Sequence, residues 1–266
     1  MPVDARNVLS RALNELDLDA LPNFDLLIEA CDELARLDDP NVTQGALNKV
    51  HGDWYEWLIA FSAWNYCSEE NLDYFILPLP NISSFDCAQL YQESLSSYIF
   101  DLRRKVEEAN VSLITSNPDF VIVDRRLLGE LQRPFVEIDL NTIHAIDNAY
   151  VRCAHQCDLE TLKGFLSVKK SLRPDRRLQI AHEGSLMKAL HSHIQTREWL
   201  INPPNLYYFA GAEKIGDADA KAFETIATHS ITNVNVKPTP AIDAHFELNS
   251  TADIQAMMLD INRMLS

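Results

Sequence analysis

The sequence predicts an α/β protein in which a mixed β-sheet is flanked by helices and preceded by a helical N-terminal portion. A chain of 266 residues with 47% apolar content can bury a sizeable core. Helical spacing dominates roughly the first 110 residues, and short β-like runs alternate with helices after that point. Because no Pro/Gly-rich linker interrupts the chain, we expect a single domain over residues 1–266, with a helical portion over about 1–110 and a core over about 111–266.

The individual elements follow from hydrophobic spacing. Apolar residues at helical intervals predict helices over 3–16, 24–37, 48–67 and 88–109. Short apolar or alternating runs predict strands at 120–124, 135–140, 164–171, 206–211 and 231–237. A long helix is expected after Pro174, which suits a first helical turn. A closing helix is expected over 250–265, where Ser250 and Thr251 provide a cap signal.

The charge of the chain is strongly acidic and unevenly spread. The formal net charge is −16, and most of the excess acid lies in the first 100 residues. This balance argues against indiscriminate binding to nucleic acid, but a local basic groove stays compatible with it because salt screens distant charges. No run of 18 apolar residues occurs, so we expect no membrane span, and an odd number of cysteines, five, suits a reducing cytoplasm.

The stretch "SVKKSLRPDRRLQIAHEG" at 167–184 concentrates the cations of this acidic chain. Strand alternation places Ser167 and Lys169 on the same face. In the following helix, the spacing of Arg176, Ile180, Glu183 and Met187 defines one largely apolar stripe. Glu183 therefore either lies buried and needs a cation or metal partner, or lies at the edge of the stripe, where it reaches solvent or pairs with Arg176.

Upstream, "NPDFVIVD" places Asp119 directly before an apolar strand. Asp119, Lys169 and Glu183 can then converge from two strands and a helix. Two carboxylates supply the hard oxygen ligands that Mg²⁺ prefers, and a lysine can steady an anionic centre. Such a constellation fits phosphodiester hydrolysis.

Arg173, Asp175 and Arg176 lie at the start of the same helix. An arginine matches the guanine O6 and N7 acceptors, and a carboxylate accepts from cytosine N4 in the major groove. These residues therefore form a candidate reader of G·C pairs. The alternative is a solvated capping cluster, in which Asp175 interacts favourably with the helix dipole.

In the pattern "SVKKSLRPDRR…E", the chain resembles the CCGG-specific type II restriction endonucleases, which have the PD-(D/E)xK nuclease fold. In most of that fold an acid lies two residues before the lysine. Ser167 occupies that position here, and this group is similar in moving the acid to the next helix, as Glu183. The resemblance implies that Asp119 and Glu183 bind Mg²⁺, that Lys169 is catalytic with Ser167 in support, and that Arg173, Asp175 and Arg176 contact the bases.

The resemblance also implies a catalytic glutamate from an N-terminal helix. Glu56 in "HGDWYEWLI" is the best match by its distance from Asp119, and Asp53 is its rival. A surface acid on an aromatic helix is the alternative interpretation of Glu56.

The implied protein is a cytoplasmic homodimer, with a tetramer left open, that cuts double-stranded DNA at a palindrome with a CCGG core. The implied ends carry 5′-phosphates and 5′-CCGG overhangs, and a companion DNA methyltransferase would protect the same site. Two alternatives stay open: a repair or junction nuclease of the same fold, and a non-catalytic regulator that binds a DNA sequence.

Overall fold

A mixed β-sheet forms the centre of the molecule in the computed structural model, which describes residues 3–115, 117–129, 132–232 and 237–266. Five strands lie in the order of the chain: β1 (Tyr74–Pro78), β2 (Phe120–Asp124), β3 (Leu162–Lys169), β4 (Tyr207–Ala212) and β5 (Ala244–Glu247). The pairs β1–β2 and β2–β3 are antiparallel, and the pairs β3–β4 and β4–β5 are parallel. The prediction of a mixed sheet with flanking helices is therefore confirmed.

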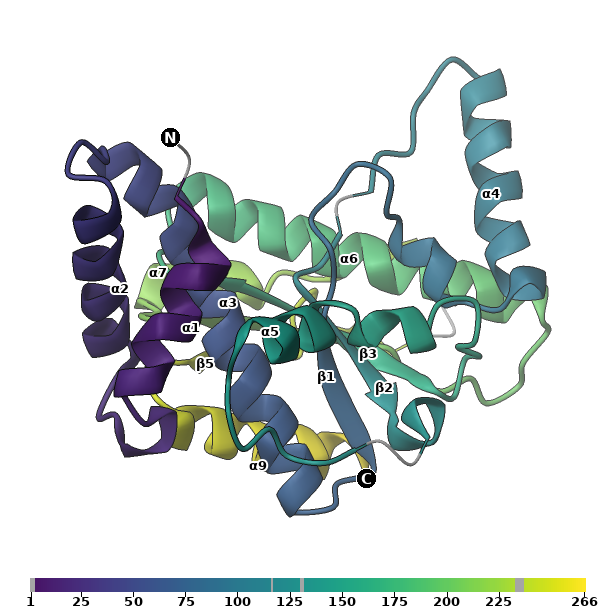
Figure 1. Cartoon of the computed structure of the whole chain (residues 1–266). Coiled ribbons are helices and arrows are strands. Elements are labelled where there is room, and N and C mark those ends of the chain that lie inside the picture. The colour runs from purple at the N-terminus through teal and green to yellow at the C-terminus, as the bar shows by residue number, and fades with distance from the viewer. Residues whose placement is uncertain (1–2, 116, 130–131, 233–236) are drawn as a thin grey trace.

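The helices surround this sheet (Figure 1). The α-helices in the described residues are α1 (Ala5–Glu15), α2 (Phe24–Asp38), α3 (Gln44–Glu69), α4 (Glu93–Glu108), α5 (Leu140–Asp147), α6 (Pro174–Arg197), α7 (Asp217–Phe223), α8 (Thr228–Thr232) and α9 (Thr251–Leu265). Short 3-10 turns lie at Leu18–Ala20, Cys87–Leu90, Arg125–Leu128 and Ala149–Arg152. None of the helices in the described ranges is both long and apolar enough to cross a membrane.

The long apolar helix α3 connects the N-terminal helices to the sheet. It packs against β1 and α9, and its tryptophans and Tyr55 are buried with their side-chain polar atoms hydrogen-bonded. The Tyr55 hydroxyl donates to the carbonyl of Leu248 at 2.8 Å, and Trp54 Nε1 donates to the carbonyl of Ala5 at 2.9 Å. Buried Tyr and Trp need such partners, so these bonds fix α3 against both the first helix and the sheet.

Helix α6 extends across the molecule from the N-terminal helices toward the protruding helix α4 (Figure 1). The apolar members of its predicted stripe are buried, with Ile180 and Ile194 fully inaccessible. Gly184 permits a close approach to the sheet side: a Cβ there would lie 2.4 Å from the carbonyl oxygen of Ala241. The close packing of α6 fixes the position of the neighbouring Glu183.

One predicted strand was wrong, and a second lies largely outside the described residues. Residues 135–140 form no strand, because Asn65 bonds both the N–H and the carbonyl of Phe135 at 2.8 and 3.2 Å. Asp139 then caps α5 through a reciprocal bond pair with Thr142. In the predicted strand 231–237, Ile231 belongs to α8, and residues 233–236 lie outside the described residues.

Candidate active site

Asp119 and Lys169 form a partly buried ion pair at adjacent strand ends. Asp119 immediately precedes β2, and Lys169 is the last residue of β3; because these strands are antiparallel, the two ends meet. Lys169 Nζ lies 2.8 Å from Asp119 Oδ2 and 3.0 Å from Oδ1. The backbone N–H of Val168 also donates to Asp119 Oδ2 at 2.7 Å. Strand β3 therefore holds the Asp119 carboxylate through both its main chain and its lysine.

Glu183 points inward from α6 and is only 4% exposed. Its Oε2 accepts from the hydroxyls of Ser167 and Tyr208, each at 3.1 Å, and its Oε1 accepts from Gln179 Nε2 at 2.9 Å. Arg176 instead donates to the carbonyl of Ser171 at 3.2 Å. The buried interpretation of Glu183 is therefore confirmed, and two hydroxyls and a side-chain amide donate to its carboxylate.

Glu56 faces the ion pair from α3. Burial, followed by repulsion from Asp119, raises the pKa of Glu56 to about 8, while Lys169 opposes that rise. Glu56 and Glu183 are also among the acids whose charge raises the pKa of Lys169. Asp53 lies one turn earlier and is exposed. The structure therefore brings Glu56 toward Lys169 and leaves its rival Asp53 at the rim.

In the cluster around Lys169, burial and the nearby negative charges both disfavour the ionised form of the carboxyl groups. Burial raises the pKa of Asp119 despite its attraction to Lys169. Burial lowers the pKa of Lys169, but the attraction and hydrogen bonding of Asp119, together with the charges of Glu56 and Glu183, outweigh burial, so the net shift is upward and the ammonium keeps its proton. Three carboxyl groups thus surround a single cation.

This excess of oxygen donors suits a hard divalent cation, which would relieve the repulsion that raises the pKa of Glu56. No group of three or more His, Cys, Asp or Glu side chains in the described ranges is already arranged to hold a metal ion. Instead, the Asp119 carboxylate is engaged by Lys169 and the Glu183 carboxylate by hydroxyl donors.

The candidate base-reading residues lie where the sequence predicts, at the N-terminus of α6. Arg173 is its N-cap and Asp175 lies in its first turn, and both are exposed. Within the described part of the chain neither has an ion-pair partner, whereas Arg177 pairs with Asp219 at 2.9 Å. A cavity of about 750 Å³ is lined by Glu56, Lys169, Arg173 and Arg176, among others. Two candidate catalytic residues therefore share a cavity with the two candidate reading arginines, whereas Asp119, Glu183 and Asp175 are not among its lining residues.

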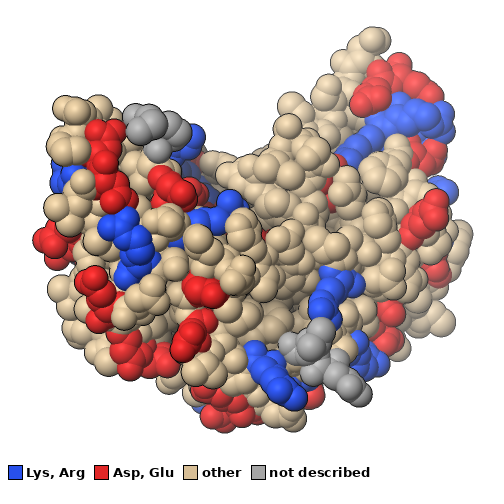
Figure 2. Space-filling view, viewed as in Figure 1, with Lys and Arg blue, Asp and Glu red and all other residues tan. Residues whose placement is uncertain are grey.

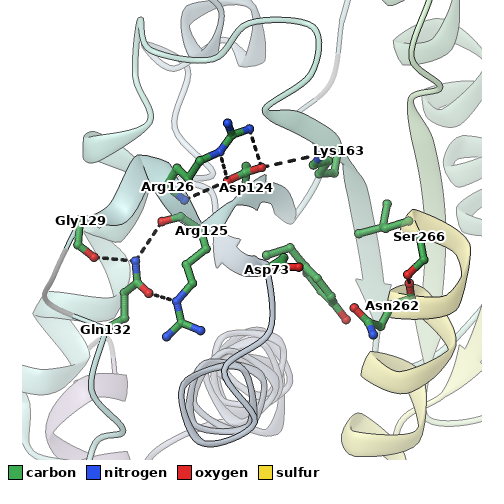
Figure 3. Close-up of a pocket in the computed structure, with 11 residues that line it drawn as sticks. Asp73, Asp124, Arg125, Arg126, Gly129, Gln132, Lys163, Asn262 and Ser266 are labelled. Carbon is green, nitrogen blue, oxygen red and sulfur yellow. Dashed lines mark hydrogen bonds and ion pairs between the residues drawn. The ribbon is translucent and has the colours of Figure 1, made fainter.

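The surface around this region is concave. Figure 2 shows a hollow between the N-terminal helices and α4, with acidic side chains spread over the outer side of the N-terminal helices. A separate cavity of about 590 Å³ lies near the C-terminus (Figure 3). Two of its cations are paired with Asp124, which lies 2.9 Å from Arg126 and 3.8 Å from Lys163. A third, Arg125, donates to the carbonyl of Leu72 at 3.0 Å. None of the candidate site residues lines that second cavity.

Sequence reasoning missed Tyr208 and Gln179, which bond Glu183. Tyr208 is fully buried on β4, and burial raises its pKa far above the usual range, so the hydroxyl keeps its proton and can donate. A tyrosine inside the apolar run "LYYFAG" does signal a buried hydroxyl that needs a partner. The sequence does not reveal that the partner is Glu183, because strand pairing and helix packing bring the two together.

The family model for the Cfr10I/Bse634I restriction endonuclease matches residues 8–263. The type II restriction enzyme Cfr10I of Citrobacter freundii is 46% identical over 238 residues, which cover 86% of this chain and 82% of that protein.

Two solved structures have the same architecture. The crystal structure of the type IIF restriction endonuclease Bse634I with cognate DNA has a TM-score of 0.84 and 29% identity. The structure of the Bse634I restriction endonuclease has a TM-score of 0.85 and 31% identity. Each comparison covers 95% of this chain and 91% of the other.

Proposed function

This chain belongs to the Cfr10I/Bse634I restriction endonuclease family, and from that membership we propose that it cuts double-stranded DNA at a palindromic site with a CCGG core. The family makes it a type II site-specific deoxyribonuclease. The observation that carries the finer proposal is one cavity, in which Lys169 lies beside Arg173 and Arg176.

We assign base reading to the residues at the N-terminus of α6. Arg173 and Arg176 donate to guanine O6 and N7, and Asp175 accepts from the N4 amino groups of the neighbouring cytosines. Two arginines in a first helical turn oppose the helix dipole, so a negative partner such as DNA would explain them. The exposure of Arg173 and Asp175 supports this role, because side chains held in ion pairs would have to be released first.

We assign cleavage to the cluster of charged side chains around the start of β2 and the end of β3. Asp119 and Glu183 are the proposed ligands of a Mg²⁺ ion, with Glu56 as the further acid. When bound, such an ion supplies positive charge to the phosphate and lowers the pKa of water. Lys169 keeps its proton and places a positive charge beside the scissile phosphate group. The Ser167 hydroxyl donates a hydrogen bond to Glu183 Oε2.

Symmetry and products follow from the proposed site. A palindrome matches a protein two-fold axis, so each subunit of a homodimer cuts one strand. Hydrolysis leaves 5′-phosphates, and a cut before the first cytosine leaves 5′-CCGG overhangs. The cell would then need a companion DNA methyltransferase acting on the same site. The family membership disfavours the regulator and the repair nuclease, neither of which needs base reading joined to cleavage.

The test is digestion of a fully sequenced phage genome with the purified protein and Mg²⁺, followed by sequencing of the fragment ends. We expect every end to lie at a CCGG core and to carry the 5′ overhang. EDTA and the Lys169→Ala variant are the controls, and each should leave the genome intact. Ends at another sequence contradict the proposed specificity, and random ends contradict a site-specific nuclease.

A further inference from the structure

Three short contacts join the side chains of Glu183, Ser167 and Tyr208 in a triangle on the buried side of Glu183. The Ser167 hydroxyl lies 3.1 Å from Glu183 Oε2 and 2.8 Å from the Tyr208 hydroxyl, which itself lies 3.1 Å from the same Oε2. The three residues come from β3, β4 and α6. Ser167 is 1% exposed and Tyr208 is inaccessible, so no solvent molecule substitutes for either donor.

The two oxygens of Glu183 have different surroundings. Oε2 is held by two buried hydroxyls, whereas Oε1 accepts from Gln179, whose side chain is exposed one helical turn earlier. An exposed side chain changes rotamer easily, but a buried one in a packed core does not. The inner oxygen is therefore fixed, and the outer oxygen faces a partner that can be exchanged.

Tyr208 is itself held rigidly. Its backbone N–H donates to Asp243 Oδ2 at 2.7 Å, and its carbonyl accepts from the N–H of Asp243 at 2.8 Å. Its ring lies 6.3 Å from that of Phe165, its partner on β3. On the other side α6 comes so close that a Cβ at Gly184 would be 3.1 Å from Tyr208 Cδ1. The hydroxyl thus has a fixed position relative to both β3 and α6.

We propose that Tyr208 is a positioning residue for the cleavage reaction, and this rests on the proposed function of Glu183 as a metal ligand. Its hydroxyl holds Oε2 and so sets the plane of the carboxylate, which leaves Oε1 directed to the divalent cation. Ser167 contributes the second bond and links the arrangement to the strand that carries Lys169. Partners of this kind, which orient a ligand, typically change metal affinity about 10–100-fold when removed.

The test is Tyr208→Phe, which removes the hydroxyl and keeps the ring. Mn²⁺ binding without DNA, followed by electron paramagnetic resonance, should weaken about 10–100-fold. The Mg²⁺ concentration that the variant needs for half-maximal cleavage should also rise. Tyr207→Phe on the same strand is the matched control and should leave both quantities unchanged. The thermal midpoint, measured in parallel, shows whether the loss is one of folding. Mn²⁺ binding by folded Tyr208→Phe as tight as in the natural protein overturns the proposal.

Glu183→Gln separates this proposal from the function on which it rests. If Glu183→Gln weakens Mn²⁺ binding and Tyr208→Phe does not, the positioning role is wrong and the metal role of Glu183 stands. If Glu183→Gln binds Mn²⁺ normally, the metal role itself is wrong. Should Tyr208→Phe not fold, a crystal structure of the natural protein with Mn²⁺ and DNA decides. The Tyr208 bond to Oε2 should persist with Oε1 on the ion; Oε2 on the ion would refute the proposal.

Discussion

His191 shows how burial sets the chemistry of single residues in this molecule. It lies on α6 with 2% of its surface exposed, and its Nδ1 lies 2.9 Å from the Tyr91 hydroxyl. Burial lowers the pKa of His191 to about 4. The imidazole is therefore neutral in the folded protein at pH values where the unfolded chain already binds a proton.

Acid should destabilise the fold through His191. The unfolded pKa is about 6.5, so between pH 6.5 and 4 the unfolded state binds more protons, and stability is lost as the pH falls. The loss should approach about 1.4 kcal/mol per pH unit from this residue alone. Urea unfolding at pH 7, 6 and 5 measures it: the free energy of unfolding should fall less steeply for His191→Gln than for the natural protein. The exposed His144→Gln is the control, and equal slopes for all three proteins would contradict the assignment.

At the residue scale, the sequence predicts that Glu183 interrupts an apolar stripe, because helical spacing depends only on local order. It does not predict which donors satisfy the buried carboxylate. Those donors come from β3, from β4 and from the preceding turn of α6, and only tertiary packing brings Ser167 and Tyr208 next to Glu183. The choice of Glu56 over Asp53 likewise depends on how α3 is rotated against the sheet.

Helix α6 joins the two proposed activities in one element. Its exposed N-terminus carries the candidate base-reading residues, and two turns later its buried face carries Glu183. Because a helix is stiff, placing the proposed reading residues in the major groove would fix the position of Glu183 relative to the DNA backbone. In this proposal the rigid helix itself couples base reading to cleavage, and no additional conformational change is needed.

Arg176→Ala should lower sequence discrimination. Loss of a bidentate guanine contact removes about 1–3 kcal/mol of preference for the correct base pair. Binding to a CCGG duplex and to a duplex with one substituted core pair, both in Ca²⁺, measures the ratio of affinities. Arg104→Ala on α4, an exposed arginine paired with Asp101 at 2.6 Å, is the control. An equal loss of affinity on both duplexes would assign Arg176 to a phosphate contact instead.

The elements differ in how well the sequence predicts them. Helices α1, α2, α3, α6 and α9 match the predictions because their apolar periodicity extends over many residues. The strands β1 and β5 were missed: both are short, and a brief apolar run such as "YFILP" does not distinguish a buried strand from a helix turn. The run at 135–140 has a β-like pattern, but side-chain bonds from Asn65 satisfy its backbone in place of a neighbouring strand.

At the scale of the whole molecule, an acidic protein has a concave face between its N-terminal helices and α4 (Figure 2), which the proposed function assigns to DNA. The net charge of −16 opposes loose attachment to arbitrary DNA, since such binding depends on neutralising phosphates. Affinity must then come from local contacts within the hollow. A net negative charge combined with local contacts favours binding to a specific DNA site over binding to the surrounding DNA.

A homodimer is expected in solution, because one chain with one cleavage centre cuts one strand of a palindrome. Sedimentation equilibrium at micromolar concentration should give about twice the 30.2 kDa mass of the chain, or four times that mass for a tetramer. The same sample should cut both strands of a plasmid with a single site. A monomer that makes the same double-strand cut would contradict the two-fold account.

The most direct test of the cleavage centre is the single-turnover rate of Lys169→Ala and Glu183→Ala on a duplex with one CCGG site. Both variants should cut at least about 1,000-fold more slowly, because each loses several kcal/mol of transition-state stabilisation, while specific binding in Ca²⁺ persists. Lys163→Ala, on the same strand but paired with Asp124, should cut at the natural rate. Cleavage by either variant at the natural rate, or loss of specific binding together with cleavage, would contradict a centre built from Asp119, Lys169 and Glu183.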